Sequence, residues 1–195
     1  EFLAQRSEFL LDDGSHLIRL AHDTDACPGV LDALVGAAEE TTSGLRPLRS
    51  FDLRIPVLAS NDARSKTLFD NAYGTGQSCW TTILDLIDPR GVGAPVAGMS
   101  VVVIGYGDVG RGCARFGAAL GARVIVVELD PVRALLASMD GFAVASLEQA
   151  AASAGMLISA TGERSTIPLS ALEAAPGGAI VTVAGGVDGE VSIDE

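Results

Sequence analysis

The feature that most constrains the fold is a glycine motif between a short apolar run and a helical pattern. Gly105, Gly107 and Gly110 have the spacing G-x-G-x-x-G, and the β-branched run 100–104 precedes them. A buried strand, a tight glycine turn and a helix are the parts that hold the pyrophosphate of a dinucleotide. Gly105 is predicted to allow the turn, Gly107 to let the pyrophosphate approach, and Gly110 to let helix and strand pack closely.

The chain beyond this motif alternates between strand and helix patterns. Such alternation predicts an α/β fold of Rossmann type, a doubly wound parallel sheet with helices on both faces. Strands are predicted at 100–104, 123–127, 142–145, 156–160 and 179–183, and helices at 109–120, from 131 onward, and at 147–152 and 169–174.

An acidic residue follows the second of these strands. Glu128 lies 18 residues beyond Gly110, where the adenosine ribose of a dinucleotide would arrive. A carboxylate accepts hydrogen bonds from both ribose hydroxyls and would repel a 2′-phosphate, which favours NAD over NADP. A glycine-rich turn without a ligand, or a site for S-adenosylmethionine, is the alternative.

The chain before the motif reads as the end of another α/β domain. Residues 9–14 and 54–60 are strand-like, 31–40 are helix-like, and 65–87 have helical character with an interruption at Gly74 and Gly76. Because residues 1–60 are too few for a complete α/β domain, and the first residue is not Met, we expect the sequence to be a stretch of something longer.

Charge and rare residues exclude several functions. A net charge of -12 argues against nucleic acid or an anionic membrane as the main partner, and no apolar run approaches the roughly 20 residues that span a bilayer. The three cysteines and two histidines have no metal-ligand spacing, so we expect no metal and thiols in a reducing cytoplasm. Lys66 is the single lysine among 13 basic residues.

Lys66 belongs to a dense polar group. It lies four residues before Asp70, so on a helix the two side chains would share a face and could be hydrogen-bonded. A surface ion pair is the bland alternative, but Asn61, Asp62 and Asn71 gather in the same stretch.

In these motifs the sequence resembles the adenosylhomocysteinase (S-adenosylhomocysteine hydrolase) family. The resemblance covers nearly the whole chain, and the order and spacing of its parts are specific. The parts are LDDG at 11–14, EETTSG at 39–44, the N-D…K…F-D-N-x-Y-G pattern at 61–74, GYGDVGRG at 105–112, GARVIVVELDP at 121–131 and T-G at 161–162.

The resemblance implies NAD-dependent hydrolysis of S-adenosyl-L-homocysteine to adenosine and homocysteine, through transient oxidation of the ribose 3′-hydroxyl. Lys66 would take the hydroxyl proton, and Asp70 would hold Lys66 and the ribose hydroxyls. Asp13 would be a proton-transfer group beside the ribose, Glu40 would bind the ribose, and Asn61 would lie near the active centre at a hinge.

The resemblance also implies a cofactor site and a domain division. Residues 1–64 would be the C-terminal part of a substrate-binding domain with its hinge, and 65–195 an NAD-binding Rossmann domain without its C-terminal tail. A homo-oligomer, dimer or tetramer, is expected. The residues expected to contact NAD are Thr41, Thr42, Ser43, Asn71, Gly105, Gly107, Asp108, Val109, Gly110, Glu128, Arg133, Thr161 and Gly185.

The chain departs from the family pattern at four positions. Gly186 and Val183 stand where the family has a histidine and an asparagine, Arg133 stands for an asparagine, and Thr75 for a cysteine. Two alternatives therefore stay open: NAD-dependent 3′-oxidation or dehydration of another nucleoside, or a non-catalytic, NAD-holding regulatory role. Since parts of the family's substrate domain and its tail are missing, these 195 residues are not expected to be a complete catalyst.

Overall fold

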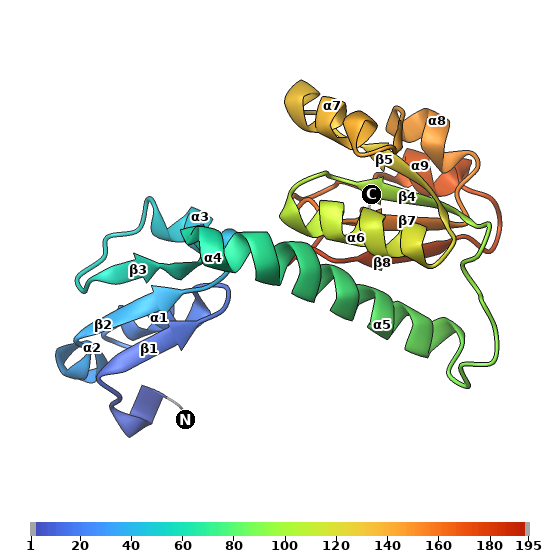
Figure 1. Cartoon of the computed structure of the whole chain (residues 1–195). Helices are drawn as coiled ribbons and strands as arrows, with labels where there is room; N and C mark the ends of the chain where they lie inside the picture. The colour runs from blue at the N-terminus through green and yellow to red at the C-terminus, as the bar shows by residue number, and fades with distance from the viewer. Residues whose placement is uncertain (1–2, 194–195) are drawn as a thin grey trace. The chain divides into compact units, whose positions relative to one another are not determined.

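The computed structural model describes residues 3–193 of the chain (Figure 1). The chain forms two compact units, Glu1–Thr67 and Leu68–Glu195, and each is described by itself. Among the described residues, no helix is long and apolar enough to cross a membrane.

The first unit is a small parallel α/β layer. Its three strands are hydrogen-bonded in the order β1-β2-β3, all parallel, and the core lies between this sheet and its helices. The elements are η1 (Leu3–Gln5), β1 (Phe9–Asp12), α1 (His16–Ala21), α2 (Val30–Ala33), β2 (Gly36–Glu39), α3 (Thr42–Leu48), β3 (Val57–Ala59), η2 (Ser60–Asp62) and α4 (Arg64–Lys66).

The predicted strands at 9–14 and 54–60 are present, but the helix predicted over 31–40 is wrong. Only Val30–Ala33 is helical, and Gly36–Glu39 is the central strand of the sheet. Over so short a length, a run of small apolar residues fits both the helical and the strand periodicity, and pairing with neighbouring strands decides which structure forms. Pairing is close here: a Cβ atom at Gly36 would lie 3.2 Å from the Pro56 carbonyl oxygen.

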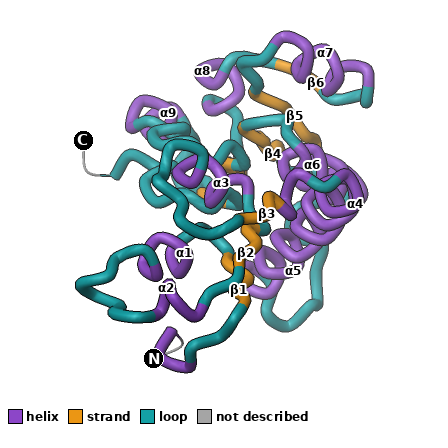
Figure 2. Tube along the Cα trace, turned by 90° about the vertical axis from the view of Figure 1, so that its left-hand side faces the viewer, coloured by secondary structure: helices purple, strands orange, loops and turns teal. Residues whose placement is uncertain are grey.

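The second unit contains the predicted Rossmann-type sheet, drawn in orange in Figure 2. Its five strands are all parallel and have the order β6-β5-β4-β7-β8. Strands β5 and β6 extend the sheet on one side of β4, and β7 and β8 extend it on the other, so the strand order reverses between β4 and β7. The elements are β4 (Ser100–Ile104), α6 (Asp108–Ala119), β5 (Arg123–Val127), α7 (Pro131–Met139), β6 (Ala143–Val144), α8 (Leu147–Ala151), β7 (Met156–Ser159), α9 (Leu169–Ala174) and β8 (Ile180–Val183).

The central strands of this sheet are buried on both faces, which explains their continuous apolar sequence. Val101 and Val103 of β4 pack in the cluster that includes α6, while Val102 and Ile104 pack in the cluster that includes α8 and α9. Both sets are at most 5% exposed. Figure 1 shows α6 on one face of the sheet and α8 and α9 on the other. Packing against helices on both faces therefore fixes the position of β4, and with it the position of the glycine turn that follows.

The helical segment predicted at 65–87 is present, but the predicted interruption at Gly74 and Gly76 is not. Residues 64–87 are helical throughout as α4, a π-helical stretch η3 (Thr67–Thr75) and α5 (Gly76–Ile87). Gly76 has a packing role instead, because a Cβ atom there would lie 2.7 Å from the Gly112 carbonyl carbon of α6. π-Helical turns are rare and are frequent at functional sites.

Candidate functional site

The polar motifs of the first unit meet at the carboxyl edge of its sheet. In the parallel register Asp12 pairs with Glu39, and Glu39 pairs with Ala59, so the three strands end at the same level. Asp13, Glu40 and Ser60 are the next residues along the chain. Loops at the carboxyl ends of parallel strands are where α/β proteins bind ligands.

Two buried carboxylates hold these loops in place. Glu39 is fully buried and accepts hydrogen bonds from the backbone N–H groups of Gly14 (3.0 Å), Ser15 (2.7 Å) and Thr41 (2.9 Å), and from the Thr41 hydroxyl (2.5 Å). Asp12, 4% exposed, accepts from the N–H groups of Asp13 (3.0 Å) and Ile18 (2.8 Å). Asp12 and Glu39 are not among the residues predicted from the sequence; the signal for them is that each directly precedes a predicted acid, Asp13 or Glu40.

The acids that the sequence singled out are the next residues along, and they are more accessible. Asp13 is exposed and Glu40 is half-buried. Thr41 begins α3 as its N-cap, and its hydroxyl accepts from the Gly44 N–H at 3.1 Å. The first acid of each pair thus builds the loop, while the second remains available to a ligand.

Lys66 is joined to this edge by hydrogen bonds within the first unit. Its Nζ donates to Asn61 Oδ1 at 3.4 Å, and Asn61 Nδ2 donates to Thr42 Oγ1 at 3.1 Å. Asn61 is 3% exposed, and the adjacent Ser60 hydroxyl donates to the Glu39 carbonyl at 2.8 Å. The structure therefore places the single lysine beside the strand ends that carry the acidic motifs.

Asp70 and Asn71 lie on the π-helical stretch η3 of the second unit. Asn71 is buried and Asp70 is exposed, with its carboxylate next to Gly74. A hydrogen bond between Lys66 and Asp70 stays a prediction.

In the second unit, the three glycines of the motif have distinct geometries. Gly105 has φ +93°, and a Cβ atom there would lie 2.9 Å from Thr161 Cγ2. A Cβ atom at Gly110 would lie 1.9 Å from the Gly105 carbonyl oxygen, so strand and helix could not pack with any larger residue. Gly107 faces open space except for Arg133 Nη1, 3.8 Å from its virtual Cβ. This cradle fits a pyrophosphate that approaches at Gly107, where α6 begins with Asp108 and Val109.

Glu128 is held at the end of β5, beside the glycine turn. Its carboxylate accepts from the backbone N–H groups of Tyr106 (2.6 Å), Leu129 (2.7 Å) and Asp130 (2.9 Å). A carboxylate offers about four acceptor positions, so one remains for a hydroxyl of a ligand. The position and charge fit the ribose of NAD and disfavour a 2′-phosphate.

A partly buried hydrogen-bond network holds Tyr106, the residue between Gly105 and Gly107. The Tyr106 hydroxyl, the residue being 2% exposed, donates to Asp140 at 2.8 Å, and Arg111 Nε donates to the same carboxylate at 2.9 Å. Burial and the hydrogen bond to Asp140 raise the pKa of Tyr106. Burial also favours a higher pKa for Asp140, but hydrogen bonds from Tyr106 and Arg111 and the charges of Arg111 and Arg115 outweigh it and lower that pKa.

The remaining expected cofactor residues follow β7 and β8. Thr161 is half-buried two residues after β7, and Gly185 is half-buried two residues after β8. Two of the positions that depart from the family pattern lie here: Val183 is the last residue of β8, and Gly186 is exposed just beyond it.

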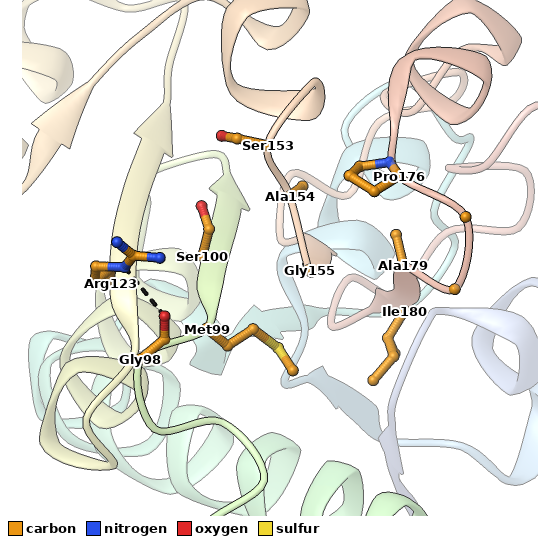
Figure 3. A pocket seen from close by; sticks show the side chains of 12 residues that line it. Gly98, Met99, Ser100, Arg123, Ser153, Ala154, Gly155, Pro176, Ala179 and Ile180 are labelled. Atoms are coloured by element: carbon orange, nitrogen blue, oxygen red, sulfur yellow. Dashed lines mark hydrogen bonds between the residues drawn. The ribbon is translucent and has the colours of Figure 1, made fainter.

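A hollow of about 360 Å³ lies at the opposite, amino edge of this sheet (Figure 3). It is lined by the residues that start the strands, and Arg123 Nε there donates to the Gly98 carbonyl oxygen at 3.1 Å. None of the predicted site residues lines it. Within residues 3–193, no group of three or more His, Cys, Asp or Glu side chains is placed to hold a metal ion.

The sequence matches known proteins along nearly its whole length. Residues 71–195 match the family described as "S-adenosyl-L-homocysteine hydrolase, NAD binding domain". Adenosylhomocysteinases of Thermotoga maritima and Pyrococcus abyssi are 42% and 44% identical over 98% and 95% of the chain, which covers 46% and 43% of them. An S-inosyl-L-homocysteine hydrolase of Methanothermobacter thermautotrophicus is 46% identical over 85% of the chain, which covers 39% of it. The chain spans less than half the length of these relatives.

Solved structures share the fold at low sequence identity. A dipicolinate synthase of Bacillus halodurans aligns with a TM-score of 0.62 and 17% identity, covering 78% of this chain and 52% of that one. A phosphoglycerate oxidoreductase of Vibrio cholerae aligns with a TM-score of 0.60 and 15% identity, covering 91% and 74%. These likenesses bear on the fold alone.

Proposed function

The chain belongs to the S-adenosyl-L-homocysteine hydrolase family, and from this premise we propose that its protein hydrolyses S-adenosyl-L-homocysteine to adenosine and homocysteine by transient oxidation of the ribose 3′ carbon. Residues 71–195 are the family's NAD-binding domain, and NAD is the cofactor. The observation that carries the proposal is the hydrogen-bonded chain Lys66–Asn61–Thr42 at a carboxyl edge that also presents Asp13 and Glu40.

The second unit is proposed to hold the cofactor. Gly107, with Asp108 and Val109 at the start of α6, would bind the pyrophosphate, and Glu128 would bind the adenosine ribose. Arg133, next to Gly107, adds a positive charge that suits the same phosphates. When bound, NAD⁺ supplies the hydride acceptor for the ribose 3′ carbon.

The first unit is proposed to handle protons and the sugar. Lys66, as the neutral amine, would take the proton of the 3′-hydroxyl, and its hydrogen bond to Asn61 Oδ1 would aim it. Asp13 would move the proton on the neighbouring carbon once the ketone has made that carbon acidic. Glu40 would accept from the ribose hydroxyls. In this assignment the buried Asp12 and Glu39 set the positions of Asp13 and Glu40 without reacting.

A second candidate differs in the base of the nucleoside. Relatives named S-inosyl-L-homocysteine hydrolase are as similar to the chain as those named adenosylhomocysteinase. The chemistry at the sugar would be the same, and the amino group of adenine would be replaced by an oxygen. Gly186 and Val183, which stand where the family has a histidine and an asparagine, favour instead a homologue that oxidises or dehydrates another nucleoside at its ribose.

Product analysis tests these proposals. The intact protein is incubated with S-adenosyl- or S-inosyl-L-homocysteine, and free homocysteine is followed together with the absorbance of reduced cofactor. Homocysteine released faster from the adenosyl compound supports the first proposal, and faster release from the inosyl compound supports the second. Reduced cofactor without homocysteine supports 3′-oxidation or dehydration of another nucleoside. Absence of both signals supports a regulatory protein.

The surface of α7 supports a homo-oligomer. Val132, Leu135 and Met139 are 74%, 63% and 79% exposed, and they recur at helical spacing along one face with Leu136 and the preceding Leu129. Such an apolar stripe is typical of a helix that is covered by a partner, and we propose a second copy of the protein. Light scattering after Leu135→Glu and Met139→Glu should show smaller particles; an unchanged mass would contradict the proposal.

A further inference from the structure

Glu190 is a buried carboxylate to which the proposed function assigns no role. It is 1% exposed and lies beyond β8, where the backbone pairs with residues 165–167. The Ile167 N–H donates to the Glu190 carbonyl at 2.9 Å, and the Ser192 N–H donates to the Ile167 carbonyl at 3.0 Å. These bonds fix the backbone on both sides of Glu190, so its side chain is held in a definite place.

One carboxylate oxygen of Glu190 accepts hydrogen bonds from two hydroxyl groups at the end of β7 and in the turn after it. Oε2 accepts from the Ser159 hydroxyl and, at 3.4 Å, from the Thr161 hydroxyl. Thr161 Oγ1 also lies 2.7 Å from Thr166 Oγ1 and accepts from the Glu163 N–H at 3.0 Å. The carboxylate is thus bonded to the end of β7 and to Thr161, which in turn is bonded to Glu163 and Thr166 of the turn that follows.

The other oxygen lies directly behind the loop that follows β8. Oε1 has no hydrogen-bond partner among the described residues. A Cβ atom at Gly185 would lie 1.8 Å from it, so Gly185 has to be glycine for the carboxylate to fit. One carboxylate thus contacts the turns after β7 and β8.

These turns lie on one side of the point where the strand order reverses. Glu128, after β5, marks the side of the adenosine ribose, and Gly107 marks the pyrophosphate. A dinucleotide that crosses the reversal point then has its nicotinamide half over β7 and β8. Burying a carboxylate is costly unless it is well bonded, so its presence here calls for a role beyond packing.

We propose that Glu190 is a positioning residue for the nicotinamide half of the cofactor, acting through Thr161 and Gly185. The inference rests on the proposed cofactor site. It assigns no contact between Glu190 and the cofactor itself. Its effect should be confined to ligands that reach across β7 and β8.

Comparing two ligands tests this role. Binding of NAD and of ADP-ribose, which lacks the nicotinamide, is measured by calorimetry on intact protein freed of cofactor. In Glu190→Gln, one hydrogen-bonding oxygen becomes an NH₂ group of similar shape; Ser159→Ala removes a donor to the carboxylate without touching either turn. NAD binding should weaken about tenfold in Glu190→Gln, the loss typical of a charge-assisted hydrogen bond, and less in Ser159→Ala. ADP-ribose binding should stay within about twofold in both.

The control is Glu148→Gln, which makes the same charge change at an exposed position of α8. It should bind both ligands as the unaltered protein does. Equal weakening of both ligands in Glu190→Gln would show a general structural defect and overturn the positioning role, and so would unchanged NAD binding. If the unaltered protein bound neither ligand, the cofactor site itself would be wrong.

Discussion

Asp12 and Glu39 are register partners at the carboxyl ends of the parallel strands β1 and β2, and both are buried. Each is followed by a second acid, Asp13 or Glu40, whose side chain is less buried. Their carboxylates accept backbone N–H groups from the loops that carry these second acids. A pair of adjacent acids at a strand end therefore divides into one that builds the loop and one that is free to act.

Replacing Glu39 by glutamine should destabilise the first unit. Each carboxylate oxygen of Glu39 accepts at least one backbone N–H, so an NH₂ group in either place would face a donor and leave it unpaired. We expect a loss of about 2 kcal/mol or more in the free energy of unfolding, measured with urea. Glu8→Gln, at an exposed position, is the control and should change little. Equal midpoints for the two variants would contradict the role of Glu39.

Replacing Gly110 by alanine should damage both the fold and the cofactor site. The added methyl group would lie 1.9 Å from the Gly105 carbonyl oxygen, so the strand and α6 would have to separate. We expect a destabilisation of about 3 kcal/mol and loss of NAD binding. Gly177→Ala adds the same group where no atom lies within 4 Å. If Gly110→Ala behaved like Gly177→Ala in thermal unfolding and NAD titration, the packing argument would fail.

Asp140 should contribute to stability in a pH-dependent way. Its pKa is lowered in the folded protein, because hydrogen bonds from Tyr106 and Arg111 outweigh the effect of burial. The contribution is then present above the unfolded pKa of about 3.9 and is lost as the pH falls through the folded value. Asp140→Asn should cost about 1 kcal/mol at neutral pH and flatten the acid side of a stability profile. An exposed control, Asp85→Asn, should leave that slope intact; a slope unchanged in Asp140→Asn would refute the assignment.

Cys79 should react as a thiolate near neutral pH. A hydrogen bond from Cys113 lowers its pKa to about 7, although partial burial opposes the shift. Alkylation of the Cys79 peptide, followed by mass spectrometry, should rise with a midpoint near that pH. Cys113→Ala removes the hydrogen bond, so the midpoint should move up toward that of an ordinary thiol. An identical midpoint in the variant would show that Cys113 does not control Cys79.

The sequence predicted the second unit better than the first. Each strand from β4 to β8 is a β-branched or apolar run next to a turn, so the local pattern and the tertiary environment of these residues agree. The segment 31–40 misled because Ala37 and Ala38 carry no strand pattern of their own; their strand forms only because β1 and β3 flank it.

The same difference explains what was missed at the site. A helix over 31–40 does not place Glu39 beside Asp12, so this prediction hides the structural role of Glu39. Glu190 was missed for another reason: its partners Ser159 and Thr161 lie 31 and 29 residues away, and nothing local marks a buried acid. Lys66, by contrast, is marked in the sequence as the single lysine and as part of the N-D…K…F-D-N-x-Y-G pattern, and its role stays a prediction.

The most direct test of the account is reduction of bound NAD by a nucleoside in the unaltered protein and in Lys66→Met. The intact protein, loaded with NAD⁺, is mixed with substrate, and the absorbance of reduced cofactor is followed with time. We predict reduction in the unaltered protein and a rate about a hundredfold to ten-thousandfold lower in Lys66→Met, with NAD binding retained. Reduction at an equal rate in both proteins would contradict it.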